Sequence, residues 1–265
     1  MTDDSRVKFK NPPVIEAWIE FRFSFKDEVP YWDELKAQAF VNDYFEGRFR
    51  VDSFLGRTEF TLSASEGRPP ALTSSKVTFE RARATNTDSD RYVQVGRDTL
   101  IYNLLRKEKD WPEYHSLRDE AMDAYGKFIQ FLRPMALQHI ALHYRDLVIV
   151  PLQGEQKIKL ENYFNICPEV PEQKFGDMSN FMVALTLPET WESGVLNLTI
   201  QSDPQVPSPE HSNEGRFRWD WHIFPKSSIR SLDKDTITSW LDQAHNDLFQ
   251  AFLSAFTKKG LGLFK

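Results

Sequence analysis

The stretch RFRWDWHIFP, residues 216–225, alternates apolar and polar side chains along its length. Successive side chains of a β-strand point to opposite faces, so this pattern predicts a strand with one buried face and one polar face. The apolar row is Phe217, Trp219, Trp221 and Ile223, and the polar row is Arg216, Arg218, Asp220 and His222. We expect the apolar row to pack beneath the amphipathic helix that follows, and the polar row to be a candidate contact surface.

The segment VIEAWIEFRF near the start of the chain shows the same alternation. Its apolar row is Ile15, Ala17, Ile19, Phe21 and Phe23, and its polar row is Glu16, Trp18, Glu20 and Arg22. A tryptophan among charged residues on the polar side is typical of the residues that dominate binding interfaces. The sequence therefore predicts a second half-buried strand whose polar row is also a candidate binding surface.

Three stretches carry apolar residues at the three- and four-residue steps of an amphipathic helix. They are residues 30–45, about 112–132, where Pro112 suits the first turn and Pro134 ends the helix, and about 236–256. The remaining alternating runs predict strands at 48–55, 57–64, 76–84, 91–105, 138–151, 181–188 and 194–202, with a short helix at 158–164.

The order of these elements predicts an α+β protein built from two pseudo-repeated units. Each half reads as a strand, a helix, several antiparallel strands and a long helix. We place the first unit at residues 1–135 and the second at 136–265, packed as one body. The order is similar to that of helix-grip and TATA-binding-protein-like halves, a topology that by itself implies no function.

Composition narrows the class of protein. The 265 residues are 40% hydrophobic and 14% aromatic, which is ample material for a core. The net charge of −6 gives no general attraction to phosphate backbones or anionic lipid, so we expect neither nucleic acid nor membrane as a partner. A single cysteine, Cys167, no apolar run long enough to cross a bilayer and a polar N-terminal segment predict a cytoplasmic protein.

Motifs for cofactors and metals are absent from the sequence. It contains no Gly-rich dinucleotide loop, P-loop, HExxH, CxxC or GxSxG pattern. His139 and His143 have the spacing of two zinc ligands on a helix, but their segment alternates like a strand. There they would lie about 13 Å apart, too far to share an ion. We therefore expect no cofactor and no metal.

A few small groups of polar residues leave catalysis open as a possibility. Asp220 and His222 share one face and could act as an acid–base pair if Ser227, Ser228 or Ser231 stood nearby. Glu16 and Glu20 would be about 13 Å apart, too far for a glycosidase pair. Cys167 has no evident base near it in sequence.

A mild basic cluster suits nucleic acid through charge and stacking. Its members are Arg81, Arg83 and Arg91, with Arg106, Lys107 and the aromatic residues Phe79 and Tyr92 nearby, while Glu80, Asp88 and Asp90 weaken its field.

Several stretches together resemble a known group of proteins. They are NPPVIEAWIEFRF, WPEYHSLRDEAMDAYGKFIQFLRP with HIALHYRDLVIVP, and the aromatic strand 216–225 with LDQAHNDLFQAFLSAF. They resemble a sporadically distributed bacterial and archaeal family of similar length and no established activity, most specifically at Pro13, Val14, Glu16 and Ala17. The family's Arg-Tyr-x-Asn-Arg-like turn is matched only in part by residues 143–146. The scattered distribution implies horizontal transfer, as for genes of mobile elements or phage defence.

These observations favour a non-catalytic binding or protein-interaction module, as a component of a bacterial defence or mobile-element system. We expect a protein partner, and open sheet edges also favour a homodimer. Two alternatives stay open: a hydrolase-type enzyme that uses Asp220 and His222, and a nucleic-acid-binding protein. The candidate binding residues are Glu16, Trp18, Glu20, Arg22, Arg216, Arg218, Asp220 and His222.

Overall fold

The computed structural model describes most of the chain. The described residues are 9–26, 31–63, 71–107, 113–152, 158–168, 180–188, 191–202 and 214–265. Pro112, at which we predicted the start of a helix, lies outside them.

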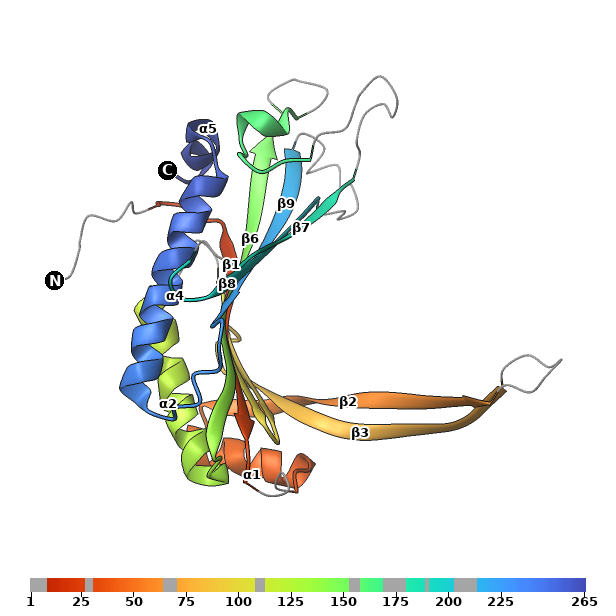
Figure 1. Ribbon diagram of the computed structural model, residues 1–265. Helices are drawn as coiled ribbons and strands as arrows, with labels where there is room; N and C mark the ends of the chain where they lie inside the picture. Colours follow the sequence, from red (N-terminus) through yellow and green to blue (C-terminus); the bar gives the residue numbers. More distant parts are fainter. Residues whose placement is uncertain are drawn as a thin grey trace.

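One open antiparallel sheet forms the body of the protein (Figure 1). Within the described residues it has nine strands in the order β2-β3-β4-β5-β1-β6-β9-β8-β7. Their bounds are β1 (Val14–Ser24), β2 (Phe49–Ser63), β3 (Ala71–Asn86), β4 (Arg91–Gly96), β5 (Thr99–Leu105), β6 (Ala136–Pro151), β7 (Met182–Leu187), β8 (Val195–Ser202) and β9 (Glu214–Phe224).

Strands β1 and β6 lie side by side at the centre of this sheet. The other strands of the first half of the chain extend to one side of the pair, and those of the second half to the other. The α+β class predicted from the sequence is confirmed. The two-unit repeat and its helix-grip or TATA-binding-protein-like topology stay predictions.

Long helices cover one face of the sheet (Figure 1). Helix α2 (Tyr114–Leu132) packs on β5 and β1, α4 (Lys234–Ala255) packs on β9 and β6, and α1 (Glu34–Phe45) lies against β2 and β3. The short α5 (Lys258–Leu261), with the 3-10 turns η1 (Leu160–Asn162) and η3 (Gly262–Phe264), completes the described helical elements. In the described part of the chain, no helix covers the opposite face, which we call the open face.

Local chemistry explains where the helices begin and end. The Asp33 carboxylate accepts a hydrogen bond from the Lys36 amide at 2.9 Å, and Asp233 accepts one from the Thr236 amide at 2.8 Å, so each caps a helix. Helix α2 ends at Arg133, which takes the left-handed conformation directly before Pro134. The prediction that this helix ends at the proline is therefore confirmed.

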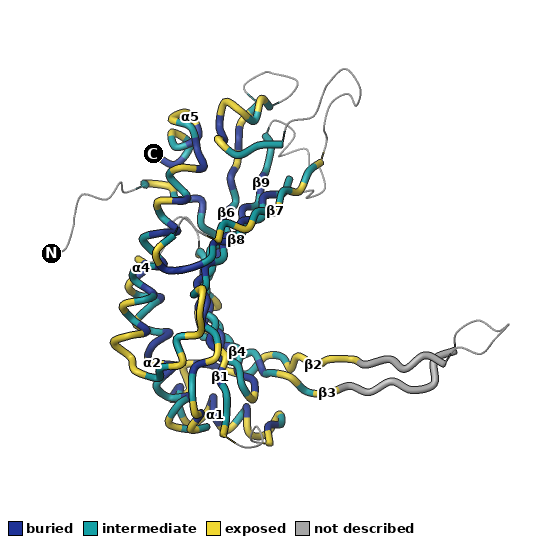
Figure 2. Tube along the Cα trace, viewed as in Figure 1, coloured by how far each residue is buried: buried dark blue, intermediate teal, exposed yellow. Residues whose placement is uncertain are grey.

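The core lies between the helices and the helix-facing side of the sheet. The apolar row of β9 is buried as predicted, with exposed fractions of 6% or less. Trp219 packs against Phe256 with ring centroids 4.8 Å apart, and Trp221 packs against Phe252 of α4. Figure 2 shows the buried residues on the helices and along the central strands. The two rows of β9 are therefore divided as the alternation predicted.

Three sequence predictions of local structure were wrong. Residues 48–55 and 57–64 were predicted as separate strands, but 49–63 form the single strand β2, in which Gly56 stays extended and pairs with Phe79 of β3. Residues 91–105 form two strands, β4 and β5, which pair with each other. The short helix predicted at 158–164 is only the 3-10 turn η1.

The β2–β3 hairpin projects from the sheet (Figure 1). Strand β4 pairs with β3 only between Arg81 and Thr85, whereas β2 and β3 pair from Phe49 and Asn86 outward to Ser63 and Ala71. Among the described residues, the outer part of this hairpin is therefore a two-stranded ribbon.

Asp146 is a carboxylate buried on the helix-facing side of β6. It is 1% exposed, and the Trp221 indole donates a hydrogen bond to its Oδ2 at 2.8 Å. Burial raises the pKa of Asp146 to about 7, and the charge of Asp220 adds to this, while the Trp221 hydrogen bond lowers it. The folded protein therefore holds this proton to a higher pH than the unfolded chain does.

We predict that Asp146→Asn becomes more stable relative to wild type as pH rises from about 4 to about 7. Over that window the folded wild type binds more protons than the unfolded chain, so ionisation opposes folding by up to about 4 kcal/mol. Asparagine still accepts the Trp221 hydrogen bond but does not titrate. Urea unfolding of both proteins across this range measures the difference; a difference that is constant with pH contradicts the assignment.

Candidate recognition surface

The two polar rows predicted from the sequence lie on the open face, on either side of β6. Strand β1 pairs with one edge of β6 and β9 with the other. Arg145 of β6 lies opposite both Glu16 and Asp220, and His143 lies opposite both Trp18 and His222. The sheet therefore brings together residues that are about 200 positions apart in sequence.

Arg145 is the central charge of the open face. Its Nη1 donates to Glu16 Oε2 at 2.8 Å, and its Nε donates to Asp220 Oδ1 at 2.6 Å. Its guanidinium also lies 5.4 Å from the centre of the Trp18 ring. Burial lowers the pKa of Arg145, but the hydrogen bond and charge of Asp220, with the charge of Glu16, raise it overall. One cation thus links three strands.

Glu16 is anchored from the other side as well. It is only 9% exposed, and its Oε1 accepts hydrogen bonds from the Tyr92 hydroxyl and from Asn103 Nδ2. Asn103 Nδ2 also lies 2.7 Å from the Tyr92 hydroxyl. Burial, followed by the contact with Glu16, raises the pKa of Tyr92. The network around Arg145 therefore extends across β4, β5, β1, β6 and β9.

A stack of aromatic rings runs across the strands beside this charge network. The Trp18 and His143 centroids are 4.4 Å apart with planes at 9°, and those of His143 and His222 are 4.1 Å apart at 10°. The ring of Phe224 lies 5.0 Å from that of His222. The stack places two imidazoles directly between a tryptophan and a phenylalanine.

Burial keeps these imidazoles neutral at physiological pH. It lowers the pKa of His143 well below its usual range, and nearby His222, His139 and Arg145 lower it further. Burial, with the charge of His139, lowers the pKa of His222 to about 4, although Glu20 opposes this. Burial also lowers the pKa of His139. Protonation would place positive charges against one another beside Arg145.

Buried polar atoms without a hydrogen-bond partner gather in this same row. Within the described residues they include His143 Nε2, His222 Nε2, Asn103 Oδ1 and Asn197 Oδ1. Cross-strand register places the four side chains in one line with Trp18. His143 Nε2 lies 3.9 Å from Glu20 Oε2, too far for a hydrogen bond. Buried polar groups normally have partners, so these four atoms are an exception to that rule among the described residues.

The remaining predicted binding residues flank this centre. Arg22 Nε donates to Glu20 Oε1 at 2.6 Å, and both lie further along β1. Arg218 Nε is 3.2 Å from Asp220 Oδ2, and Arg216 Nη1 is 3.8 Å from Glu214 Oε1. All eight candidate residues therefore lie on β1 and β9, the two strands that border β6.

The predicted basic cluster is divided between the two faces. Arg83 lies over the ring of Tyr92, 4.5 Å from its centre, on the open face. Arg91 instead donates to Glu120 of α2 at 2.6 Å and belongs to the helix-covered face. The predicted clustering of Arg91 with Arg83 is therefore wrong. Arg83 lies over Tyr92, and Arg91, the neighbour of Tyr92 in β4, points to the opposite face. Arg106 and Lys107 donate to the carbonyls of Pro12 and Asp88.

Asp220 and His222 share a face, but each makes other contacts. Both Asp220 oxygens face arginines, and the His222 ring stacks on His143. The nearby serines serve the backbone: Ser228 Oγ donates to the Gln138 carbonyl at 3.1 Å, and Ser231 Oγ accepts from the Asp233 amide. The described contacts of Asp220, His222, Ser228 and Ser231 are therefore with arginines, aromatic rings and the backbone, and none of them joins a serine to Asp220 or His222.

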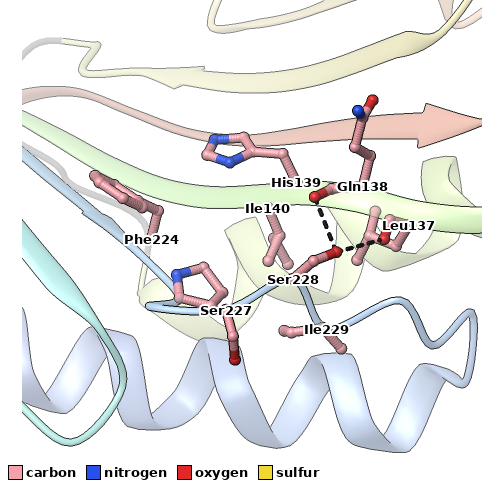
Figure 3. A pocket seen from close by; sticks show the side chains of 9 residues that line it. Leu137, Gln138, His139, Ile140, Phe224, Ser227, Ser228 and Ile229 are labelled. Carbon is pink, nitrogen blue, oxygen red and sulfur yellow. Dashed lines mark hydrogen bonds between the residues drawn. The ribbon is translucent and has the colours of Figure 1, made fainter.

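A pocket of about 230 Å³ lies at the end of β6 and β9. Ile140, Phe224 and Pro225 form part of its wall. Figure 3 shows the Ser228 hydroxyl bonded to the β6 backbone, with the His139 ring on the other side of that strand. The two side chains are therefore not directed toward one another.

Two further features are absent from the part of the chain that the structure describes. No group of three or more His, Cys, Asp or Glu there is arranged to hold a metal ion. None of the helices described has the length and apolar character needed to span a membrane. Cys167 is half-buried.

The sequence interpretation missed the most central residues. Arg145 was not singled out, His143 was considered only as a metal ligand, and Tyr92 only as a stacking group for nucleic acid. Alternation in residues 138–151 could have placed His139, His143 and Arg145 in one row. The pairing of that row with β1 and β9 is what gives it importance. Residues 143–146, which match the family's turn only in part, lie within β6 and form no turn here.

Comparison of the chain with models of protein families found no match, and comparison with curated proteins found none either. The family resemblance therefore stays a prediction.

We predict that Arg145→Met lowers the free energy of unfolding by about 1–3 kcal/mol, because it leaves Glu16 partly buried without its cation and leaves Asp220 paired with Arg218 alone. The matched variant Arg22→Met removes a pair whose arginine is largely exposed and should change stability by less than about 1 kcal/mol. Urea titrations compare the two. In a Glu16→Gln, Asp220→Asn background the effect of Arg145→Met should shrink, and an equal effect there argues against the charge bridge.

We also predict that His222→Phe reduces the loss of stability in acid. The pKa of His222 is lower in the folded protein than in the unfolded chain, so wild-type stability falls as pH drops from about 6.5 to about 4, by up to about 3 kcal/mol from this group. Phenylalanine keeps a stacking ring and cannot bind a proton. Thermal unfolding across this range measures the effect, with the exposed His115→Phe as control. Parallel curves for His222→Phe and wild type contradict it.

Proposed function

We propose that this protein is a non-catalytic recognition module that binds a protein partner through the open face of its sheet. The observation that carries the proposal is the centre of that face. There the Glu16–Arg145–Asp220 bridge and the Trp18–His143–His222 stack lie side by side in an uncovered part of the sheet. Tryptophan and arginine are the residue types that most often dominate protein interfaces.

The rigidity of this centre supports recognition. Each charged group at the centre already has a partner from another strand, so its side chain is held before a ligand arrives. A preformed surface loses less conformational entropy on binding than a flexible one.

The charges of the open face support a protein partner over nucleic acid. At the centre of this face, on β1, β6 and β9, Arg22, Arg145, Arg216 and Arg218 are interleaved with Glu16, Glu20, Asp220 and Glu214. A surface of alternating sign suits the mixed charges of another protein, whereas a phosphate backbone needs an excess of cations.

The hydrolase alternative has less support. A general base must hold its reacting partner within hydrogen-bond reach, and the contacts of Asp220 are to arginines. The low pKa of His222 also makes it a weak base near neutral pH.

Two broader elements of the sequence interpretation belong to the same proposal. The two units, 1–135 and 136–265, would each contribute one of the two central strands, and the open face would form where they join. The cytoplasmic location rests on the single cysteine and the composition, and the role in a bacterial defence or mobile-element system rests on the family resemblance alone.

The test is affinity capture from a lysate of the native host, with quantitative mass spectrometry of the captured proteins. We expect wild type to recover a specific partner. The double variant Arg22→Glu, Arg218→Gln should recover at least tenfold less of it, because it changes two charges of the proposed binding surface. A tenfold loss of affinity corresponds to about 1.4 kcal/mol in binding free energy. Reconstitution of the captured partner with purified wild type then measures binding directly.

The matched control is Lys258→Glu, Lys265→Gln, which changes the net charge by the same amount at exposed positions near α5. It should bind as wild type does. Equal recovery with both double variants, or no specific partner with wild type, contradicts the proposal.

A further inference from the structure

Strand β7 forms one edge of the sheet. Among the described residues it pairs only with β8, from Met182 opposite Gln201 to Leu187 opposite Leu196, without a register shift. The N–H and C=O groups along its outer side point away from the sheet. Such an edge is a template for another strand unless it carries charges, proline or a bulge.

The two edges of the sheet differ in this protection. Strand β2, at the opposite edge, includes Arg50, Asp52, Arg57 and Glu59 in its sequence and is interrupted by register shifts. Strand β7 has the sequence MVALTL, with no charge and no irregularity. Its Met182 side chain is 69% exposed. Among the described residues, one edge therefore carries features that block strand addition, whereas the other carries none of them.

The apolar side chains on the helix-facing side of β7 lie at the margin of the core. Val183, Leu185 and Leu187 lie opposite Ile200, Leu198 and Leu196, which are buried, yet they themselves are only half-buried. A neighbouring strand with apolar side chains in the same row would cover them.

We propose that β7 pairs antiparallel with β7 of a second copy of this chain, so that the sheet continues across a twofold axis. An antiparallel strand pair places residues of the same face opposite one another. With the axis perpendicular to the sheet, the Val183, Leu185 and Leu187 rows of both copies meet on the helix-facing side. The strand has no charge, so it meets itself without repulsion.

This arrangement places the open faces of both copies on the same side of the assembly. A closed twofold dimer results, because the β7 edge of each copy pairs with the β7 edge of the other. A partner with two or more equivalent sites would then bind both copies, which raises its apparent affinity without any new contact. The dimer is independent of the residues assigned to partner binding.

Sedimentation equilibrium of the full chain over a wide concentration range tests the pairing. Wild type should have the mass of two chains, and Thr186→Lys should weaken the association at least tenfold, because it places two lysines close to the axis. The matched control Thr58→Lys adds the same charge at an exposed position of β2 and should remain a dimer. A single-chain mass for wild type at all concentrations overturns the proposal.

Hydrogen exchange locates the contact. Amides of residues 182–187 should exchange more slowly in wild type than in Thr186→Lys, and dilution should remove the difference. Urea unfolding confirms that both lysine variants are folded. A dimer that Thr186→Lys leaves intact, with no change in exchange at β7, places the interface elsewhere and also overturns the proposal.

Discussion

The pairing of β1 with β6 is the constraint on which the rest of the structure depends. It joins the strands of the first and second halves of the chain into one sheet and sets which residues lie opposite each other. A shift of one residue in a strand moves every side chain to the other face. In β1 this would place Glu16 and Glu20 in the core and expose Phe21, so burial of the apolar row fixes the polar row as well.

The same constraint explains the chemistry of the open face. Glu16 and Asp220 approach each other because both lie opposite Arg145, and the cation offsets the repulsion between them. The imidazoles of His143 and His222 avoid adding charge because burial favours their neutral forms. The centre of the face therefore carries two carboxylates and one cation, while the further cations Arg22, Arg216 and Arg218 lie toward its sides.

Much of the fold followed from local patterns in the sequence. Alternation identified β1 and β9 with the correct faces, and three- and four-residue spacing identified α1, α2 and α4. The predicted strand boundaries were wrong at two places where the same kind of sequence can continue a strand or end it. Gly56 lies within the extended strand β2, whereas the residues around Arg97 separate β4 from β5. Propensity alone cannot distinguish a bulge from a turn.

The site was harder to predict because it depends on non-local pairing. The eight candidate residues share the open face, but nothing in the sequence indicates that β6 lies between their strands. Arg145 gains its role from two cross-strand partners, one about 130 and one 75 residues away. Such contacts require knowledge of strand order and register, which alternation does not contain.

The projecting β2–β3 hairpin has a consequence for how this protein can change over evolution. The backbones of its outer residues pair only with each other among those described, so no helix or central strand pairs with this part of the hairpin. Insertion or removal of residues in pairs would preserve the alternation of both strands. The reach of this arm can therefore diverge between relatives while the arginine bridge and the ring stack stay unchanged.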